Sequence, residues 1–202
     1  GANSVATNTV LGDNALDAAV TGGFNTAVGY NALTTNTSGA DNVAIGYDAL
    51  ATNADGSTNT AVGKSALKLN STGGSNTAVG REALESNTSG GTNTAVGLQA
   101  LGDNTTAGDS VAVGYLAAGA ATTAAGTVAI GRETLGSGVM TGDYNTAVGY
   151  TAGKVVTSGT YNTLVGHKAG LALTTGTSNV LIGDQAGDEQ TGSLHNTVIG
   201  AE

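Results

Sequence analysis

The sequence predicts an all-β protein, a parallel β-roll (β-solenoid) of twelve turns, each roughly 17 residues long. A phrase of the form Asn-Thr-Ala-Val-Gly recurs twelve times, and ten of the eleven intervals between its final glycines equal the interval from Gly12 to Gly29. Only the interval from Gly131 to Gly149 is longer, by one residue. A fixed period of this kind is typical of repeat architectures, in which each turn buries its apolar face only by stacking on its neighbours.

The composition limits both the core and the classes of partner. The 202 residues include 34 Gly, one Phe, six Tyr and no Trp, so the core must be thin and built from small side chains. The net charge is −9 with only six Lys and Arg, which argues against nucleic acid as a partner because phosphate binding needs clustered cations. The absence of Cys excludes disulfides and thiolate metal sites.

The repeat occupies nearly the whole sequence, from Asn8 to Gly200. We therefore expect a single repeat domain, 1–202, that is a segment of a longer fibrous protein whose anchor and capping parts lie outside it. No uninterrupted apolar stretch has the length that a membrane span needs, so no membrane insertion by this segment is expected. With parallel turns stacked at about 4.8 Å, twelve turns would form a rod on the order of 55 to 60 Å long.

When the repeats are aligned at their final glycines, equivalent residues of successive turns form columns. The first column of each repeat phrase is Asn in ten of the twelve turns, with Ser110 and Thr127 as the exceptions. An amide side chain both donates and accepts, so identical Asn residues on successive turns can bond to one another or to a bend in the backbone. We therefore predict a structural ladder and not a binding site at this column. Its first members are Asn25, Asn42, Asn59, Asn76 and Asn93.

The next three columns are expected to form the strand. They are Thr or Val, then mostly Ala, then always an aliphatic residue, as in Thr26-Ala27-Val28. Because successive side chains of a strand point to opposite faces, the Thr/Val and aliphatic columns share one face and Ala lies on the other. We expect the Thr/Val and aliphatic face to fill the interior of the roll and the smooth Ala face to contact another copy. The predicted interface consists of Ala27, Ala44, Ala61, Ala78, Ala95, Ala112, Ala129 and Ala147.

After each glycine come two variable positions that we expect to face solvent, followed by Ala and then Leu or Gly, which close the turn against the strand. The rest of each turn is a Thr/Asn/Ser/Gly loop. The extra residue before Gly149 is expected in the loop around 138–143, since the columns resume at Asn145. Candidate surface-recognition residues occupy the first variable position. They are Tyr30, Tyr47, Lys64, Arg81, Tyr115, Arg132 and Tyr150, whose stacked tyrosines could hold sugars or proteins, although tolerant surface residues are the simpler interpretation.

The strand phrases resemble a known group of repeats. Asn42-Val43-Ala44-Ile45-Gly46 and Ser110-Val111-Ala112-Val113-Gly114 are similar to the repeats of YadA-like trimeric autotransporter adhesin heads, and the longer phrase 25–33 is similar to repeats of phage-type tail fibres. The resemblance implies a homotrimer of left-handed parallel β-rolls, located extracellularly at a cell surface or in a tail fibre. It also implies attachment to a host cell, a matrix or a surface through an unknown glycan or protein receptor. The turns here are longer than those of the usual adhesin head.

No catalytic, cofactor or metal site is predicted. His167 and His195 occupy different columns, and the Gly-Asp pairs of the loops lack the carboxylate density of calcium-binding repeats, so they are better interpreted as turns. Neither a phosphate-binding G-x-x-x-x-G-K-S/T motif nor a G-x-S-x-G nucleophile elbow occurs.

The sequence favours a non-enzymatic structural or adhesive fibre segment. An alternative is an ice-binding β-solenoid that uses a Thr ladder, in which four turns carry Val in place of Thr. The ladder would consist of Thr9, Thr26, Thr60, Thr77, Thr94, Thr146, Thr163 and Thr197. A polysaccharide-cleaving solenoid ranks lowest, because no pair of carboxylates with glycosidase geometry can be identified.

Overall fold

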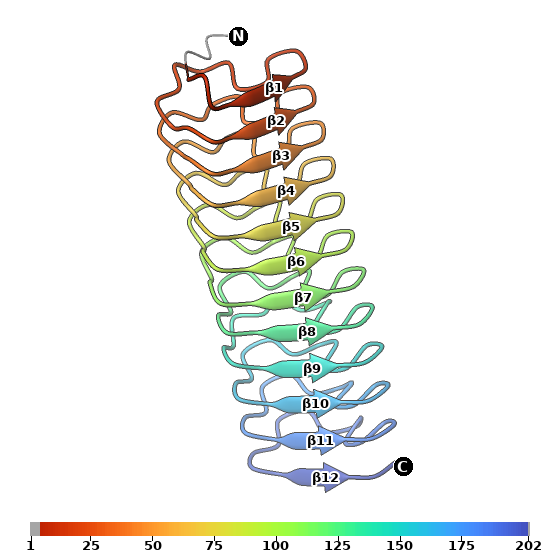
Figure 1. The fold of residues 1–202 in the computed structure, drawn as a ribbon. Coiled ribbons are helices and arrows are strands. Elements are labelled where there is room, and N and C mark those ends of the chain that lie inside the picture. The colour runs from red at the N-terminus through yellow and green to blue at the C-terminus, as the bar shows by residue number, and fades with distance from the viewer. Residues whose placement is uncertain (1–4, 202) are drawn as a thin grey trace.

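The chain forms one parallel β-solenoid, with a single three-residue strand in each turn (Figure 1). The computed structural model describes residues 5–201. Its strands are β1 (Thr9–Leu11), β2 (Thr26–Val28), β3 (Val43–Ile45), β4 (Thr60–Val62), β5 (Thr77–Val79), β6 (Thr94–Val96), β7 (Val111–Val113), β8 (Val128–Ile130), β9 (Thr146–Val148), β10 (Thr163–Val165), β11 (Val180–Ile182) and β12 (Thr197–Ile199). They pair in chain order into one 12-stranded sheet, which confirms the predicted all-β fold.

The register of the sheet follows the sequence period. Thr60 of β4 pairs with Thr77 of β5, one repeat further along, whereas the step from Val128 of β8 to its partner Thr146 of β9 is longer by one residue. The extra residue is accommodated near Met140, whose side chain is fully buried and which pairs with Ala121, while the neighbouring Val139 is 66% exposed. The insertion therefore lies in the loop where the sequence predicts it.

The predicted facing of the strands is wrong. The central alanines point into the roll and are completely buried within a single chain, so they cannot contact a second copy. This correction applies to Ala27, Ala44, Ala61, Ala78, Ala95, Ala112, Ala129 and Ala147, each with 0% exposure. The Thr/Val and aliphatic columns instead point outward, as in β3, where Val43 is half-buried and Ile45 is 40% exposed.

The narrow interior explains this orientation. In the early turns a strand alanine is combined with a fully buried leucine later in the same turn, as Ala27 is with Leu33. In β10 the strand carries Leu164, and the later position is Gly170, where an added Cβ would lie 3.0 Å from Leu164 Cδ2. The interior thus holds at most one leucine per turn at these two positions, and in the inner turns the residue opposite a leucine is alanine or glycine. A valine or isoleucine facing inward beside a leucine in these turns would overfill the interior.

The predicted Asn column forms a buried hydrogen-bonded ladder. In the fifth turn the backbone N–H of Asn76 donates to Asn59 Oδ1 at 3.0 Å, and Asn76 Nδ2 donates to the carbonyl oxygen of Gly90 at 2.9 Å. The same two bonds recur at most of the other turns with Asn, for example from Asn59 to Asn42 Oδ1 and to Gly73. Asn25, Asn42, Asn59, Asn76 and Asn93 are at most 1% exposed. Each residue therefore joins one turn to the next and fixes the following bend.

A second Asn ladder lies in the loop that the sequence suggests is merely polar. Its members, all with 0% exposure, are Asn36, Asn53, Asn70, Asn87 and Asn104. Asn70 Nδ2 donates to Asn53 Oδ1 at 2.7 Å and to the Gly73 carbonyl at 2.9 Å. The next turn carries Ala121 at this position, and Asn104 Oδ1 is left buried without a partner among the described residues. The ladder ends there, and buried apolar side chains such as Met140 continue the column.

Each turn bends at repeated residues with positive φ. The buried leucine that follows the surface columns is one of them, as at Leu33 with φ 52°. A left-handed residue other than glycine costs about 1–2 kcal/mol, whereas full burial of a leucine side chain contributes about 1.5–3 kcal/mol. Burial therefore offsets the backbone cost, so a residue type that normally avoids such bends occupies one in most turns.

Candidate functional site

The most extensive candidate for a functional surface is the outward side of the sheet, here called the sheet face. It consists of two side-chain columns, one from the first and one from the third residue of every strand. The first column is Thr9, Thr26, Val43, Thr60, Thr77, Thr94, Val111, Val128, Thr146, Thr163, Val180 and Thr197. The second column is Leu11, Val28, Ile45, Val62, Val79, Val96, Val113, Ile130, Val148, Val165, Ile182 and Ile199.

The sheet face carries Val, Ile or Leu at sixteen of its 24 positions, Thr at the other eight, and no charged residue at any of them. Seven of the twelve side chains in its second column are exposed, from 36% at Val79 to 40% at Ile45 in the inner strands and up to 72% at Ile199 in the last strand, and the other five are half-buried. With strands about 4.8 Å apart, the strip is roughly 50 Å long. Monomeric soluble proteins rarely expose contiguous apolar patches beyond a few hundred Å², and larger ones mark interaction surfaces. The sheet face is therefore the strongest candidate for a contact surface.

The threonines of the sheet face alternate irregularly with valines. Within residues 5–201, no hydrogen bond joins a threonine hydroxyl of this column to another protein group. The hydroxyls are thus available to water or to a partner, while four turns present a methyl group in place of the hydroxyl.

One edge of the sheet face is formed by the residue that follows each repeat glycine, here called the trailing column. It contains all the predicted recognition residues, and they do lie together on the surface. The column runs Asp13, Tyr30, Tyr47, Lys64, Arg81, Leu98, Tyr115, Arg132, Tyr150, His167, Asp184 and Ala201.

Side chains of the trailing column stack on one another along the rod. The rings of Tyr30 and Tyr47 stack with centroids 5.3 Å apart, and Lys64 Nζ lies 5.8 Å from the Tyr47 ring centroid. Arg132 lies between Tyr115 and Tyr150, at 5.3 and 6.0 Å from their ring centroids. Because neighbours cover the ring faces, the tyrosines present mainly their edges and hydroxyls, which differs from an open platform for a sugar ring.

The opposite edge of the sheet face is formed by the residue just before each Asn-ladder position, here called the leading column. The sequence interpretation did not single it out. It runs Thr7, Phe24, Asp41, Thr58, Ser75, Thr92, Asp109, Gly126, Tyr144, Tyr161, Ser178 and His195. Tyr144 and Tyr161 stack with their ring centroids 5.3 Å apart, and Phe24 is 67% exposed. The aromatic side chains of this column could have been found by aligning the repeats one position further toward the N-terminus.

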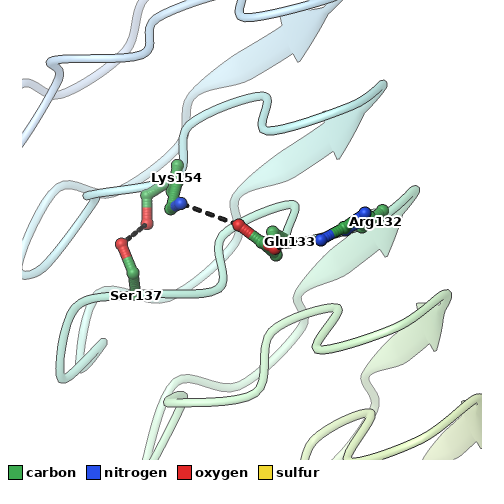
Figure 2. A network of polar contacts seen from close by, with 4 residues as sticks. All are labelled: Arg132, Glu133, Ser137 and Lys154. Atoms are coloured by element: carbon green, nitrogen blue, oxygen red, sulfur yellow. Dashed lines mark hydrogen bonds and ion pairs between the residues drawn. The ribbon is translucent and has the colours of Figure 1, made fainter.

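Ion pairs link neighbouring turns beside the trailing column, as Figure 2 shows for one network. Glu133 accepts from Lys154 Nζ at 2.7 Å and lies 3.2 Å from an Arg132 nitrogen, and Ser137 donates to the Lys154 carbonyl oxygen at 3.1 Å. The hydrogen bond from Lys154, together with its charge and that of Arg132, lowers the pKa of Glu133. A lowered pKa stabilises the fold above the ordinary glutamate pKa of about 4.3, and this contribution is lost as pH falls through the lowered value.

A second surface pair joins the turns near β11. His167 Nδ1 lies 2.6 Å from Asp184 Oδ1, and this hydrogen bond lowers the pKa of Asp184. Both side chains are about half exposed, so the pair serves as a surface contact between turns.

No chemical centre emerges from the described part of the chain. Three successive turns carry Gly102, Gly119 and Gly136 at one position, which leaves a shallow hollow bordered by Glu85 and Asp103. Among residues 5–201, no three His, Cys, Asp or Glu side chains come together in a way that could hold a metal ion. The same residues include no helix with the length and hydrophobicity needed to cross a membrane.

Comparisons with protein-family models, with curated proteins and with solved structures find no match to this chain.

Proposed function

We propose that this chain is a non-enzymatic structural segment of an attachment fibre, in which three copies associate side by side through the sheet face. The observation that carries the proposal is the uncharged apolar strip that runs over all twelve strands on the outside of the roll. The strand phrases resemble those of trimeric adhesin heads and tail fibres, which supports a role in attachment at a cell surface or in a tail fibre. The partner that covers the strip is therefore another copy of the chain, and the receptor, a glycan or a protein, contacts the surface left outside it.

The energetics favour burial of the sheet face over its exposure. Removing apolar surface from water contributes about 25 cal/mol for each Å². The aliphatic side chains gain little more burial inside one chain, because the interior is already filled by Ala and Leu. Since each turn adds the same small contribution, a contact that is weak at one turn becomes strong when twelve turns in register repeat it. Lys or Glu at an outward strand position would prevent such a contact, and none occurs there.

A charged residue in the middle of the sheet face is expected to dissociate the assembly. Val96 lies on β6 and is 36% exposed in the single chain, so Val96→Glu leaves the fold of one roll intact. In a trimer, three carboxylates would lose water close to one another, and their burial and repulsion disfavour association. Sedimentation velocity should show trimers for the parent chain and monomers for Val96→Glu, with unchanged circular dichroism.

The matched control is Ser89→Glu, which adds the same charge at an exposed loop position outside the sheet face. It should stay trimeric. Equal behaviour of the two variants would contradict the assignment of the interface.

Ice binding is the second candidate, and the outward position of the Thr column is the observation that favours it. A regular array of exposed hydroxyl and methyl groups could order water on a flat sheet. The two functions compete for the same surface, because a trimer would cover the hydroxyls. Strong thermal hysteresis from a monomeric chain would favour ice binding and reject the fibre proposal, whereas its absence in a trimeric protein would reject ice binding.

A further inference from the structure

We infer that the two edges of the sheet face are complementary to each other, so that the leading column of one copy packs against the trailing column of the next. The copies then run parallel around an axis along the rod. The inference rests on the proposed self-association and adds its geometry. It gives the trailing-column residues a role between chains instead of a role in receptor binding.

The charges of the two edges are opposite in sign along the middle of the rod. In the leading column the charged residues are Asp41 and Asp109, whereas over the same stretch the trailing column carries Lys64, Arg81 and Arg132 and turns acidic only near its ends, at Asp13 and Asp184. Arg81 and Arg132 already pair with Glu82 and Glu133 of their own chain, so Lys64 is the cation most available to a neighbouring copy. Within the described residues neither Asp41 nor Lys64 makes an ion pair, and they belong to consecutive turns, about 4.8 Å apart along the rod. A leading column placed beside a trailing column brings acids next to bases, while like columns placed together bring like charges together.

Aromatic side chains occur at both edges of the same turns. Phe24 and Tyr30 flank β2, and Tyr144 and Tyr150 flank β9. The Tyr144 ring lies over the preceding turn, where Gly126 leaves room for it, since a Cβ there would lie 2.6 Å from Tyr144 Cδ1. If neighbouring copies stand at the same height, aromatic edges meet aromatic edges at these turns. Such pairs contribute about 0.5–1.5 kcal/mol beyond the area that they bury.

The symmetry of an assembly determines which edges of the sheet face can meet. Rotation about an axis along the rod keeps copies parallel and at one height, and it places the leading edge of each copy against the trailing edge of its neighbour. Rotation about an axis perpendicular to the rod, with the two sheet faces opposed, gives an antiparallel pair in which leading edge meets leading edge and trailing edge meets trailing edge. The complementary edges therefore select a parallel, closed arrangement, which is also the arrangement that a trimer requires.

Cysteine cross-linking tests the edge pairing cleanly, because the chain contains no cysteine. Thr92 of the leading column and Leu98 of the trailing column flank β6, and neither is charged. The width of the sheet face separates them within one chain by more than the ~7 Å between Cα atoms that a disulfide permits. Under mild oxidation, the double variant Thr92→Cys/Leu98→Cys should form a covalent three-chain species on a non-reducing denaturing gel, and each single variant should remain uncross-linked.

The outcomes separate this inference from the proposed function. Covalent dimers from either single variant would show that like edges meet and would overturn the inference. If light scattering gives the mass of a trimer but the double variant forms no disulfide, the edge pairing is overturned and the proposed trimer stands. A double variant that ends at two linked chains would support the edge pairing and reject the trimer. A monomeric chain at all concentrations would overturn both.

Discussion

Gly63→Ala is expected to destabilise the solenoid by about 3 kcal/mol or more, the upper end of the cost of a strained backbone residue. Gly63 follows β4 with φ +133°, a conformation that side chains rarely adopt. A Cβ added there would lie 2.5 Å from the carbonyl oxygen of Gly80, the equivalent glycine of the next turn. Neither backbone can move away without breaking the pairing of β4 and β5, so the substitution should uncouple the first four strands from the eight that follow. Urea denaturation followed by circular dichroism measures the loss.

The control for this substitution is Gly192→Ala, which adds the same methyl group at a glycine without positive φ. The nearest atom to its added Cβ is Thr175 Oγ1 at 3.4 Å, an ordinary contact. We expect a change within about 0.5 kcal/mol for this variant. If both variants lost the same stability, the close approach of successive repeat glycines would not explain why glycine is required after each strand.

Asn76→Ala is expected to cost about 2–4 kcal/mol, because it removes every hydrogen bond of one side chain of the buried ladder, including a bond from Asn76 Nδ2 to Asn59 Oδ1 at 3.2 Å. The Asn93 backbone N–H, which donates to Asn76 Oδ1 at 3.0 Å, would be left buried without an acceptor. The Gly90 carbonyl would lose the donor that now lies 2.9 Å away. Chemical denaturation measures the free energy of unfolding, and amide hydrogen exchange at Asn93 should show faster local opening.

Asn76→Ser distinguishes the hydrogen bond from simple packing. The chain itself uses serine at this column in the seventh turn, where Ser110 Oγ accepts from the Thr127 backbone N–H at 3.2 Å. The serine variant should therefore keep the bond to Asn93 and lose less stability than the alanine variant. Equal losses for serine and alanine would contradict the role given to the ladder.

The period alone was enough to predict the parallel stack, its register and the first Asn ladder. Each of these follows from equivalent residues lying above one another, for example Asn59 above Asn42. The site of the extra residue could be predicted as well, because the columns resume at Asn145 on the far side of the loop. None of these features depends on which side of the strand faces inward.

The facing of the strand could not be predicted by the same reasoning. Alternation shows that Ala27 lies opposite Thr26 and Val28, but it does not show which side is inside. Hydrophobicity favours the larger aliphatic residues for the core, whereas the narrow interior of the inner turns carries alanine in the strand wherever a leucine follows later in the turn. The later turns contained the missing signal, because Leu164 in the strand coincides with Gly170 in place of the usual leucine.

The second Asn ladder was missed for a different reason. A loop of Thr, Asn, Ser and Gly is normally taken as exposed turn chemistry, yet Asn53 and Asn70 are fully buried and bonded to each other. Their spacing of one repeat was visible in the sequence. Column analysis of the loop, and not of the strand alone, would have identified them.

The mass of the native protein in solution tests the central claim most directly, since the sheet face must be covered by other copies if the chain forms a fibre. Light scattering across a range of concentrations should give about three times the 19.3 kDa mass of one chain. A mass equal to one chain at every concentration would contradict self-association through the sheet face.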